Sequence, residues 1–501
     1  MAKSEIQKEH YGLALLLALA AVWIFHKLSS GSLPAFDDTT YALIAKTILK
    51  TGDWITMRWL NIPYFFSGKP PLNFWLTAFF YKILGISEFS SRLSTALHGI
   101  AGIAAVYFLG ALYSPRVGLI SAAFLISFPD YFRLSQSAML EIPLTVYMTL
   151  SLMFYLRARR DLSTRYYCLS GIACGLAIMT KSVVGITPLL VIALFHFLKG
   201  NPRALLTKNF AGVVVSALAV ALPWHIWEFV RHGKAFVTKY LLGTISHTLT
   251  DVLVTAHRSS PAFYLRILYT NEPAHLVLFL ASLPLLFTLA VKKNRESLLL
   301  LIYIAFLLVL FTSFDTRMPW YITPAFPAMA VSSALLLSRI SEEGDFGQAV
   351  SLVLAGAFVI QMASLWRDDH WYLHGNPDLK QIAQDFKMKS SPDDVLFSYG
   401  FGDPVNAGPF YGDRKVIFLT SSEDELRVQR RIEDYLEAGL VEYVPDERGL
   451  IDKLCSTRYH HVILRSETYE MFRDKLKLRG AKPITQNQSY VIVRFSCSSD
   501  D

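Results

Sequence analysis

The sequence predicts an α-helical polytopic membrane protein that carries a soluble α/β domain at its C-terminal end. Of the 501 residues, 53% are apolar and only 18% are charged, which is too little charge for an ordinary soluble protein. Several apolar runs approach the roughly 20 residues that a transmembrane helix needs. Charge rises after about residue 367, where strand-like and helical stretches alternate. We therefore expect a transmembrane domain over residues 1–366 and an α/β domain over residues 367–501.

About eleven apolar segments are expected to form the membrane spans. The first resembles a signal peptide, but the rest of the chain is equally apolar, so an uncleaved first span is the better interpretation. Several segments are shorter than a full span, which indicates tilted, broken or hairpin-paired helices. The predicted spans cover residues 11–29, 94–112, 117–132, 140–156, 166–180, 183–198, 209–227, 273–291, 297–314, 318–338 and 347–366.

A further apolar run, residues 72–84, is short and contains Lys82. The positive-inside rule decides its place. If it lies along the interface, within a first outer loop of residues 30–93, the basic short loops all face the cytoplasm; if it spans the bilayer, that pattern inverts. We therefore expect interfacial helices, an inside amino terminus and a C-terminal domain outside a bacterial cytoplasmic (inner) membrane. The residues that follow the rule are Lys3, Lys8, Arg116, Arg157, Arg159, Arg160, Arg165, Lys199, Arg203, Lys208, Lys292, Lys293, Arg295 and Arg339.

The net charge of +8 is largely explained by these cytoplasmic loops, so nucleic acid is not expected as a partner. Two predicted outer loops, residues 30–93 and 228–272, are also rich in lysine and arginine. Long loops tolerate such charge without a function. The alternative is a basic cavity for a lipid-linked phosphate.

The four cysteines predict no disulfide framework. Cys168 and Cys174 lie in one apolar segment and are expected to be small core residues. Cys455 and Cys497 could pair if the tail lies outside the cytosol, but two cysteines alone leave this open.

Two charged motifs stand near the predicted outer end of the first span. Asp37 and Asp38 are adjacent, and Lys69 precedes two prolines among aromatic residues. Paired carboxylates beside a membrane are costly and usually have a task. A lysine at the same surface suits a phosphate contact. Together these residues indicate an enzyme that works where lipid meets water.

Three later residues share that predicted side. Glu141 precedes an Ile-Pro pair, where an acidic helix start is the structural alternative. Lys181 lies in a turn between two short spans, where snorkelling alone would explain it. Arg317 lies in a charged turn between the ninth and tenth spans. Acids and bases converging on one cavity fit a transfer reaction, in which a carboxylate deprotonates an acceptor and cations stabilise a phosphate leaving group.

These motifs resemble, in order, those of the family that includes aminoarabinose transferases of lipid A and protein O-mannosyltransferases. The resemblance covers about residues 30–366 and implies a GT-C fold and a polyprenyl-phosphate sugar as donor. The motifs are Phe36-Asp37-Asp38, Lys69-Pro70-Pro71-Leu72 with Trp75, Leu140-Glu141-Ile142-Pro143-Leu144, Thr180-Lys181, and Arg317-Met318-Pro319-Trp320-Tyr321 with Pro324.

The resemblance also implies a role for each residue, with Asp37 as the base that acts on the acceptor. Asp38, Glu141 and Arg317 keep the charge but not the length of the side chains common in the family. No cofactor is certain, and a divalent metal ion is an open expectation. The candidates are Asp37, Asp38 and Glu141 for catalysis; Lys69, Lys181, Arg58 and Arg317 for the donor phosphate; and Tyr321, His257 and Arg258 for weaker substrate contacts.

The expected function is therefore a membrane glycosyltransferase that moves a sugar to lipid A, another glycan or a protein. The tail is expected to supply no catalytic group. The rival interpretation is a transporter or flippase for a lipid-linked or anionic solute. A transporter would favour ionisable groups near mid-bilayer and inverted repeats, whereas these charges gather at one predicted face and no repeat is visible. A third alternative is a pseudo-enzyme scaffold with a sensory outer domain.

Overall fold

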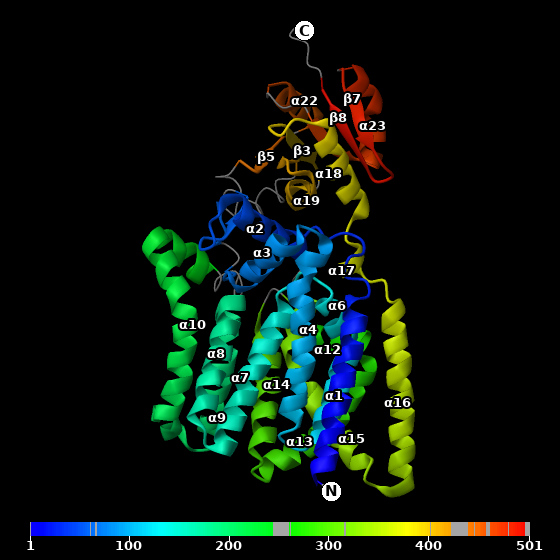
Figure 1. Ribbon diagram of the computed structural model, residues 1–501. Coiled ribbons are helices and arrows are strands. Elements are labelled where there is room, and N and C mark those ends of the chain that lie inside the picture. Colours follow the sequence, from blue (N-terminus) through cyan, green and yellow to red (C-terminus); the bar gives the residue numbers. More distant parts are fainter. Residues whose placement is uncertain are drawn as a thin grey trace. The chain divides into compact units, whose positions relative to one another are not determined.

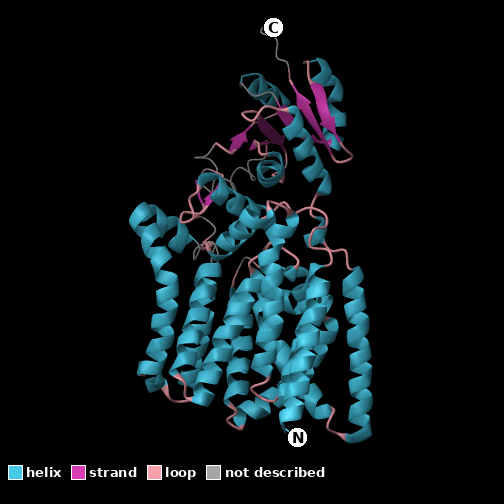
Figure 2. Cartoon of the chain, viewed as in Figure 1, coloured by secondary structure: helices cyan, strands magenta, loops and turns pink. Residues whose placement is uncertain are grey.

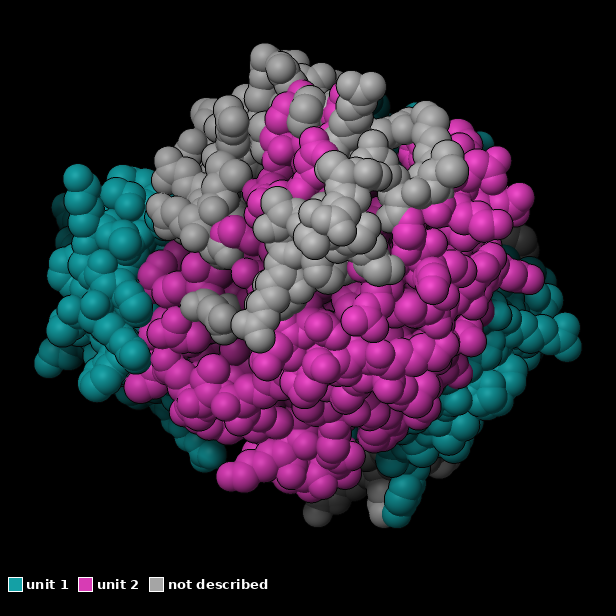
Figure 3. All heavy atoms as spheres, turned by 90° about the horizontal axis from the view of Figure 1, so that it is seen from above, with its two compact units in different colours: residues 1–28, 67–76, 92–370 teal, residues 29–66, 77–91, 371–501 magenta. Residues whose placement is uncertain are grey.

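The computed structural model describes residues 2–60, 62–65, 68–243, 260, 262–314, 317–400, 402–421, 439–444, 446–456, 461–478 and 480–495. The chain divides into two compact units, shown in different colours in Figure 3. Unit 1 comprises Met1–Leu28, Ser67–Leu76 and Arg92–His370, and unit 2 comprises Ser29–Phe66, Thr77–Ser91 and Trp371–Asp501. The predicted first outer loop thus contributes residues to both units.

Unit 1 is a bundle whose described secondary structure is helical (Figures 1 and 2). Its wholly or mainly included helices are α1 (Ala2–Phe25), α4 (Glu88–Gly110), α5 (Pro115–Ser127), α6 (Pro129–Ser135), α7 (Glu141–Asp161), α8 (Thr164–Lys181), η1 (Ser182–Ile186), α9 (Thr187–Leu198), η2 (Pro202–Leu206), α10 (Lys208–His232), η3 (Phe236–Leu242), α12 (Phe263–Asn271), α13 (Pro273–Val291), α14 (Arg295–Ser313), η5 (Pro319–Ala325), α15 (Phe326–Ile340) and α16 (Gly344–Arg367).

The expectation of a multi-span membrane protein is confirmed. Within the described residues, seven helical segments are long and apolar enough to cross a membrane, and the bent pair α5–α6 would make an eighth. Many large apolar side chains on α10, α13 and α16 are exposed, as expected for helix faces that contact lipid. The count of about eleven spans stays a prediction, because α1 and α7 are not among these segments.

The two short spans predicted over residues 166–180 and 183–198 correspond to α8 and α9. The chain reverses between them at Ser182, whose φ of 39° lies in a region that few non-glycine residues adopt. Gly185 then lies so close to α8 that a Cβ there would stand 2.3 Å from the carbonyl carbon of Ala177. The chain therefore folds back between α8 and α9, although Thr164–Leu198 enters the seven segments counted above as a single one.

Unit 2 contains the predicted α/β domain. Its six-stranded sheet has the order β5-β4-β3-β6-β8-β7, with the first four strands parallel and the last two antiparallel to their neighbours. Buried apolar residues of the strands and of two helices form its core. Its elements are α17 (Trp371–His374), α18 (Pro377–Lys389), β3 (Val395–Tyr399), α19 (Pro404–Gly412), β4 (Lys415–Thr420), β5 (Val441–Tyr443), α22 (Glu447–Ser456), β6 (His461–Arg465), α23 (Ser466–Leu478), β7 (Lys482–Gln486) and β8 (Tyr490–Arg494).

Unit 2 also includes the helix that begins with the two aspartates, α2 (Asp37–Thr51), and the hairpin β1 (Arg58–Trp59) and β2 (Ile62–Pro63). Helix α2 packs against α19. The buried Lys46 donates a hydrogen bond of 3.1 Å to the carbonyl oxygen of Pro409 and lies 2.9 Å from a carboxylate oxygen of Asp413. A lysine suits this position because the last carbonyls of a helix lack partners within it.

The predicted interfacial run 72–84 is a helix with those bounds, α3 (Leu72–Leu84). It is apolar but shorter than a full span. Its residues up to Leu76 belong to unit 1, and those from Thr77 onward belong to unit 2.

Candidate functional site

The centre of the candidate site in unit 1 is a buried ion pair. The ammonium nitrogen of Lys181 lies 2.6 Å from Oε1 of Glu141, and the two side chains are only 11% and 4% exposed. Lys181 is the last residue of α8 and Glu141 is the first residue of α7. Packing of these neighbouring helices brings together two residues that lie forty positions apart.

Glu141 is held in place by its position at the helix start. Its Oε2 accepts a hydrogen bond of 3.1 Å from the backbone N–H of Leu140, which precedes the helix. Carboxylates are favoured at this end because the first N–H groups of a helix point outward and carry partial positive charge. Thr145 donates to the Glu141 carbonyl at 2.7 Å. The alternative reading of Glu141 as a helix start is correct, and it coexists with the ion pair.

Tyr321 completes this arrangement, which we call the Glu141 cluster (Glu141, Lys181 and Tyr321). The Lys181 nitrogen lies 4.4 Å from the centre of the Tyr321 ring. Tyr321 belongs to η5, which packs against α7. A cation over an aromatic face is stabilised without being neutralised. The ammonium group of the lysine, with its three N–H donors, is therefore held between a carboxylate and an aromatic ring.

Two polar residues that the sequence did not single out, Tyr240 and His225, are linked by hydrogen bonds to Ser182. The Tyr240 hydroxyl hydrogen bonds with Ser182, the residue after Lys181. The Tyr240 hydroxyl is also 2.9 Å from Nε2 of His225. Tyr240 lies in η3, a short π-helix, and such elements are frequent at functional sites. Neither residue stands in a recognisable motif, so only their packing identifies them.

The guanidinium group of Arg317 forms hydrogen bonds at the C-terminal end of α14. Its Nη2 and Nε donate to the carbonyl oxygen of Thr312 at 2.7 and 3.2 Å. This is a common use of a cation near a helix C-terminus. Its expected phosphate contact stays a prediction.

The Lys-Pro-Pro motif contributes Lys69, which is half-buried, and leads into α3. Four residues later, Asn73 is only 5% exposed, and neither polar atom of its side-chain amide has a hydrogen-bond partner among the described residues. Buried amides without partners are rare because burial costs them their hydrogen bonds to water. The sequence placed Asn73 inside the motif but gave no reason to assign it a role.

Asp37, Asp38 and Arg58 belong to unit 2. The two aspartates form the first turn of α2; Asp38 is 1% exposed and Asp37 is half-buried. Arg58 lies 3.5 Å from a carboxylate oxygen of Asp53. The structure thus gathers the candidates into two groups, with Glu141, Lys181 and Tyr321 in contact in unit 1.

The remaining candidates are not tested by the structure. His257 and Arg258 lie outside the described residues. Among the residues that are described, no group of three or more His, Cys, Asp or Glu side chains could hold a metal ion. The expectation of a divalent ion therefore stays open.

The sequence of this chain is similar to those of several known proteins. Residues 68–227 match the family model described as dolichyl-phosphate-mannose-protein mannosyltransferase. An uncharacterised protein of Aquifex aeolicus is 26% identical over 65% of this chain and 64% of its own length. The undecaprenyl phosphate-α-4-amino-4-deoxy-L-arabinose arabinosyl transferase 2 of Pseudomonas fluorescens is 26% identical over 66% of this chain. The match covers only 57% of that relative's own length.

Among solved structures, the crystal structure of ArnT from Cupriavidus metallidurans bound to undecaprenyl phosphate aligns with a TM-score of 0.76 and 20% sequence identity. The alignment covers 96% of this chain and 97% of that one. The chain is therefore a polytopic membrane protein that shares the fold of ArnT. The predicted resemblance to aminoarabinose transferases and protein O-mannosyltransferases is confirmed as a similarity of sequence and of fold.

Proposed function

We propose that this protein is a glycosyltransferase of a bacterial cytoplasmic membrane. It transfers a hexosyl or pentosyl residue from a polyprenyl-phosphate donor to a lipid, glycan or protein acceptor on the outer face, where its C-terminal domain also lies. The observation that carries the proposal is the buried Glu141 cluster in a chain with the fold of ArnT. The relative from Pseudomonas fluorescens is named for an undecaprenyl phosphate donor, which favours the same chemical class here.

The proposed reaction breaks the bond between the anomeric carbon of the sugar and the phosphate oxygen. The acceptor hydroxyl or amine forms the new bond to that carbon, and its proton passes to Asp37. The bonding electrons leave with the phosphate, which gains negative charge. Lys69 and Lys181 are the proposed contacts for that charge, with Arg58 and Arg317 as weaker ones. Cations fixed in advance stabilise developing charge without reorganising during the reaction.

The Glu141 cluster suits this task because it fixes the position of Lys181 before donor binds. Glu141 neutralises the buried lysine, and the Tyr321 ring covers another part of it. When a donor phosphate arrives, it competes with Glu141 for the same N–H donors. We propose that Glu141 is a positioning residue for Lys181, and that Asp37 is the catalytic base. Asn73 offers an amide to the donor or acceptor from the Lys-Pro-Pro motif.

A transporter for a lipid-linked solute is the alternative function. The buried ion pair would suit it in part, because intramembrane charges often mark transport paths. However, Glu141 and Lys181 stand at helix ends, whereas a transporter site is expected near the middle of its spans.

Deletion of the gene, followed by mass analysis of envelope lipids, glycans and proteins, tests the proposal. One component should lose the mass of a single sugar residue, and that mass identifies the sugar as a hexose or a pentose. The wild-type gene and a Lys208→Ala control, altered at an exposed position, should restore the component. Lys181→Ala should not.

Purified protein in sealed lipid vesicles completes the test. It should release free polyprenyl phosphate from a polyprenyl-phosphate sugar only when the acceptor is present. Movement of the intact donor across the membrane, without any covalent transfer, would instead establish the transporter.

A further inference from the structure

A second charged site lies at the other end of helix α7. Arg159 stands eighteen residues after Glu141 on this helix. At a rise of 1.5 Å per residue, the two are separated by roughly 27 Å along the helix axis, close to the hydrocarbon thickness of a bilayer. The positive-inside rule assigns the Arg159 end to the cytoplasmic side. The proposed transfer reaction does not use this end of the bundle.

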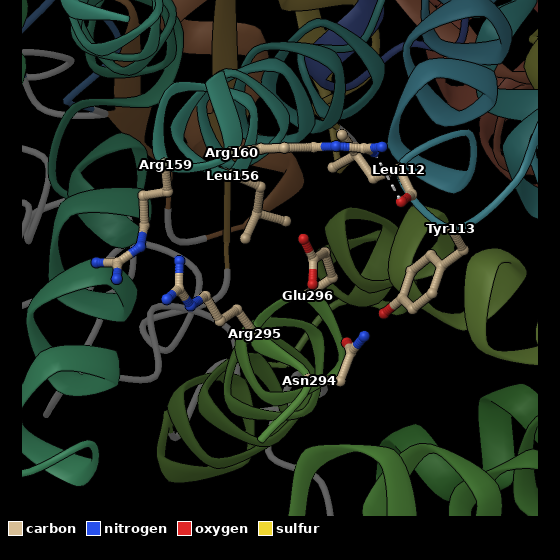
Figure 4. A pocket seen from close by; sticks show the side chains of 8 residues that line it. All are labelled: Leu112, Tyr113, Leu156, Arg159, Arg160, Asn294, Arg295 and Glu296. Carbon is tan, nitrogen blue, oxygen red and sulfur yellow. Dashed lines mark hydrogen bonds between the residues drawn. The ribbon is translucent and has the colours of Figure 1, made fainter. Parts of the chain in front are cut away.

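The site is a cavity of about 490 Å³ that lies between three helix ends (Figure 4). Arg159 and Arg160 come from the end of α7, Tyr113 from the turn after α4, and Asn294, Arg295 and Glu296 from the start of α14. Three guanidinium groups therefore face this space together with one carboxylate. The local charge is positive.

None of the three arginines forms an ion pair with a carboxylate among the described residues. Arg160 donates to the carbonyl oxygen of Leu112 at 3.2 Å. Arg159 donates to the Tyr155 hydroxyl at 3.3 Å, lies 3.2 Å from Nε2 of His196 and stands over the Phe195 ring. The Arg295 side chain forms no hydrogen bond with any described residue. The Nε of Arg159 is buried and has no hydrogen-bond partner in the described chain. Donors of this strength normally find an acceptor.

Like charges also crowd together at this cavity. The guanidinium groups of Arg159 and Arg295 point toward one another in Figure 4. Burial, followed by the charges of Arg295 and Arg159, lowers the pKa of the neighbouring Lys199. Cations that face one another without an acid between them repel, and an anion placed between them removes that repulsion.

We infer that this cavity binds a phosphate group, and that the phosphate belongs to an anionic membrane lipid. Arginine matches phosphate with two parallel N–H donors, which makes it the usual residue for such recognition. Asn294 caps α14 by accepting a hydrogen bond of 2.8 Å from the N–H of Ser297, and the N-terminal end of that helix adds partial positive charge. Leu112 and Leu156 line the same cavity, and Phe197 and Leu198 are exposed at the end of α9. These apolar surfaces favour a lipid over free phosphate.

The inference can be tested on the full-length protein in neutral detergent by native mass spectrometry. Delipidated protein is titrated with phosphatidylglycerol, with zwitterionic phosphatidylcholine, or with inorganic phosphate. We expect phosphatidylglycerol to bind more tightly than phosphatidylcholine. Arg295→Gln should weaken binding of phosphatidylglycerol about tenfold, as expected for loss of a charge-assisted hydrogen bond. Arg203→Gln removes the same charge from an exposed position outside the cavity and should change nothing.

Thermal unfolding of each variant shows whether it is folded, and Arg295→Lys should recover part of the binding. Binding of phosphatidylglycerol by an Arg159→Gln/Arg295→Gln variant as tightly as by wild type would overturn the inference, as would equal binding of the two lipids. Displacement of phosphatidylglycerol by millimolar inorganic phosphate would support phosphate recognition. Binding of inorganic phosphate without any binding of phosphatidylglycerol would refute the lipid assignment.

Discussion

The ammonium nitrogen of Lys181 lies 2.6 Å from a carboxylate oxygen of Glu141 and 4.4 Å from the centre of the Tyr321 ring. A buried ion pair of this kind contributes little net stability, because both charges lose their hydration. Removal of one partner is much more costly, since it leaves the other charge buried and unpaired. The pair therefore fixes the position of a charged lysine more than it stabilises the fold.

The first prediction follows from this asymmetry. Glu141→Ala should destabilise the protein by about 3–5 kcal/mol, because Lys181 would stay buried without a partner. The double variant Glu141→Ala/Lys181→Met should recover a large part of that loss. Unfolding of detergent-solubilised protein measures both effects, with Glu343→Ala at an exposed position as the control. Additive effects of the two substitutions would show that the pair is not energetically coupled.

The second prediction concerns the proposed base. Asp37→Asn should reduce the transfer rate by about 10²–10⁴-fold while donor binding and folding stay near normal. The amide keeps the shape of the carboxylate but cannot accept a proton at neutral pH. Steady-state transfer with a polyprenyl-phosphate sugar provides the measurement. Asp345→Asn, an exposed acid of α16, is the matched control. Full activity of Asp37→Asn would assign the Asp37–Asp38 pair to a structural or metal-holding role.

The third prediction distinguishes a functional from a structural role for Asn73. Its buried amide has no hydrogen-bond partner among the described residues, so Asn73→Leu should leave stability unchanged or raise it. If the amide binds substrate, transfer should nevertheless fall by at least about tenfold, as for the loss of one hydrogen bond. Loss of stability together with loss of activity would indicate a structural role for Asn73.

The fourth prediction concerns acid stability of unit 2. Asp413 lies 2.9, 2.6 and 2.7 Å from the ammonium groups of Lys46, Lys50 and Lys387. Burial acts to raise the pKa of Asp413, but hydrogen bonds from the three lysines outweigh it and hold the pKa well below its usual range. A depressed pKa means that the ionised group stabilises the fold at neutral pH. This stabilisation is lost only as the pH falls from about 3.9, the ordinary value, toward the folded-state pKa.

Asp413→Asn should therefore destabilise unit 2 by about 2 kcal/mol at pH 7, as for loss of hydrogen bonds to a charged group. The difference from wild type should shrink below about pH 4, where Asp413 becomes protonated in the unfolded chain while it stays ionised in the folded protein. Hydrogen exchange of α2 and α19 in the full-length protein measures both. A difference that stays constant between pH 7 and pH 3 would contradict the assignment.

The fifth prediction tests the topology. A reporter fused after Arg160 should be cytoplasmic, and one fused after Asp369 should be external, because the basic short loops alternate with this arrangement. If both reporters lie on the same side, the number of spans between them is wrong by an odd number. The proposed common outer side of the candidate residues would then be lost.

The sequence by itself determined the class of this protein, because hydropathy and strand patterns depend on residues close together in the chain. It located the apolar segments, the turn at Lys181 and the helix start at Glu141, and it predicted an α/β tail whose strands occur near the expected residues. The family resemblance was likewise readable, since its motifs are short and occur in a fixed order.

Only the tertiary structure decided which of these residues meet. The contact of Lys181 with Glu141 and Tyr321 joins segments forty and one hundred and forty positions apart in the chain. It depends on how α7, α8 and η5 pack, which no local pattern specifies. The same reason explains why Tyr240 and Asn73 were missed, and why helix α2 with Asp37 was not expected to pack against α19. Burial fixes the position of a side chain, and burial depends on how the whole fold packs.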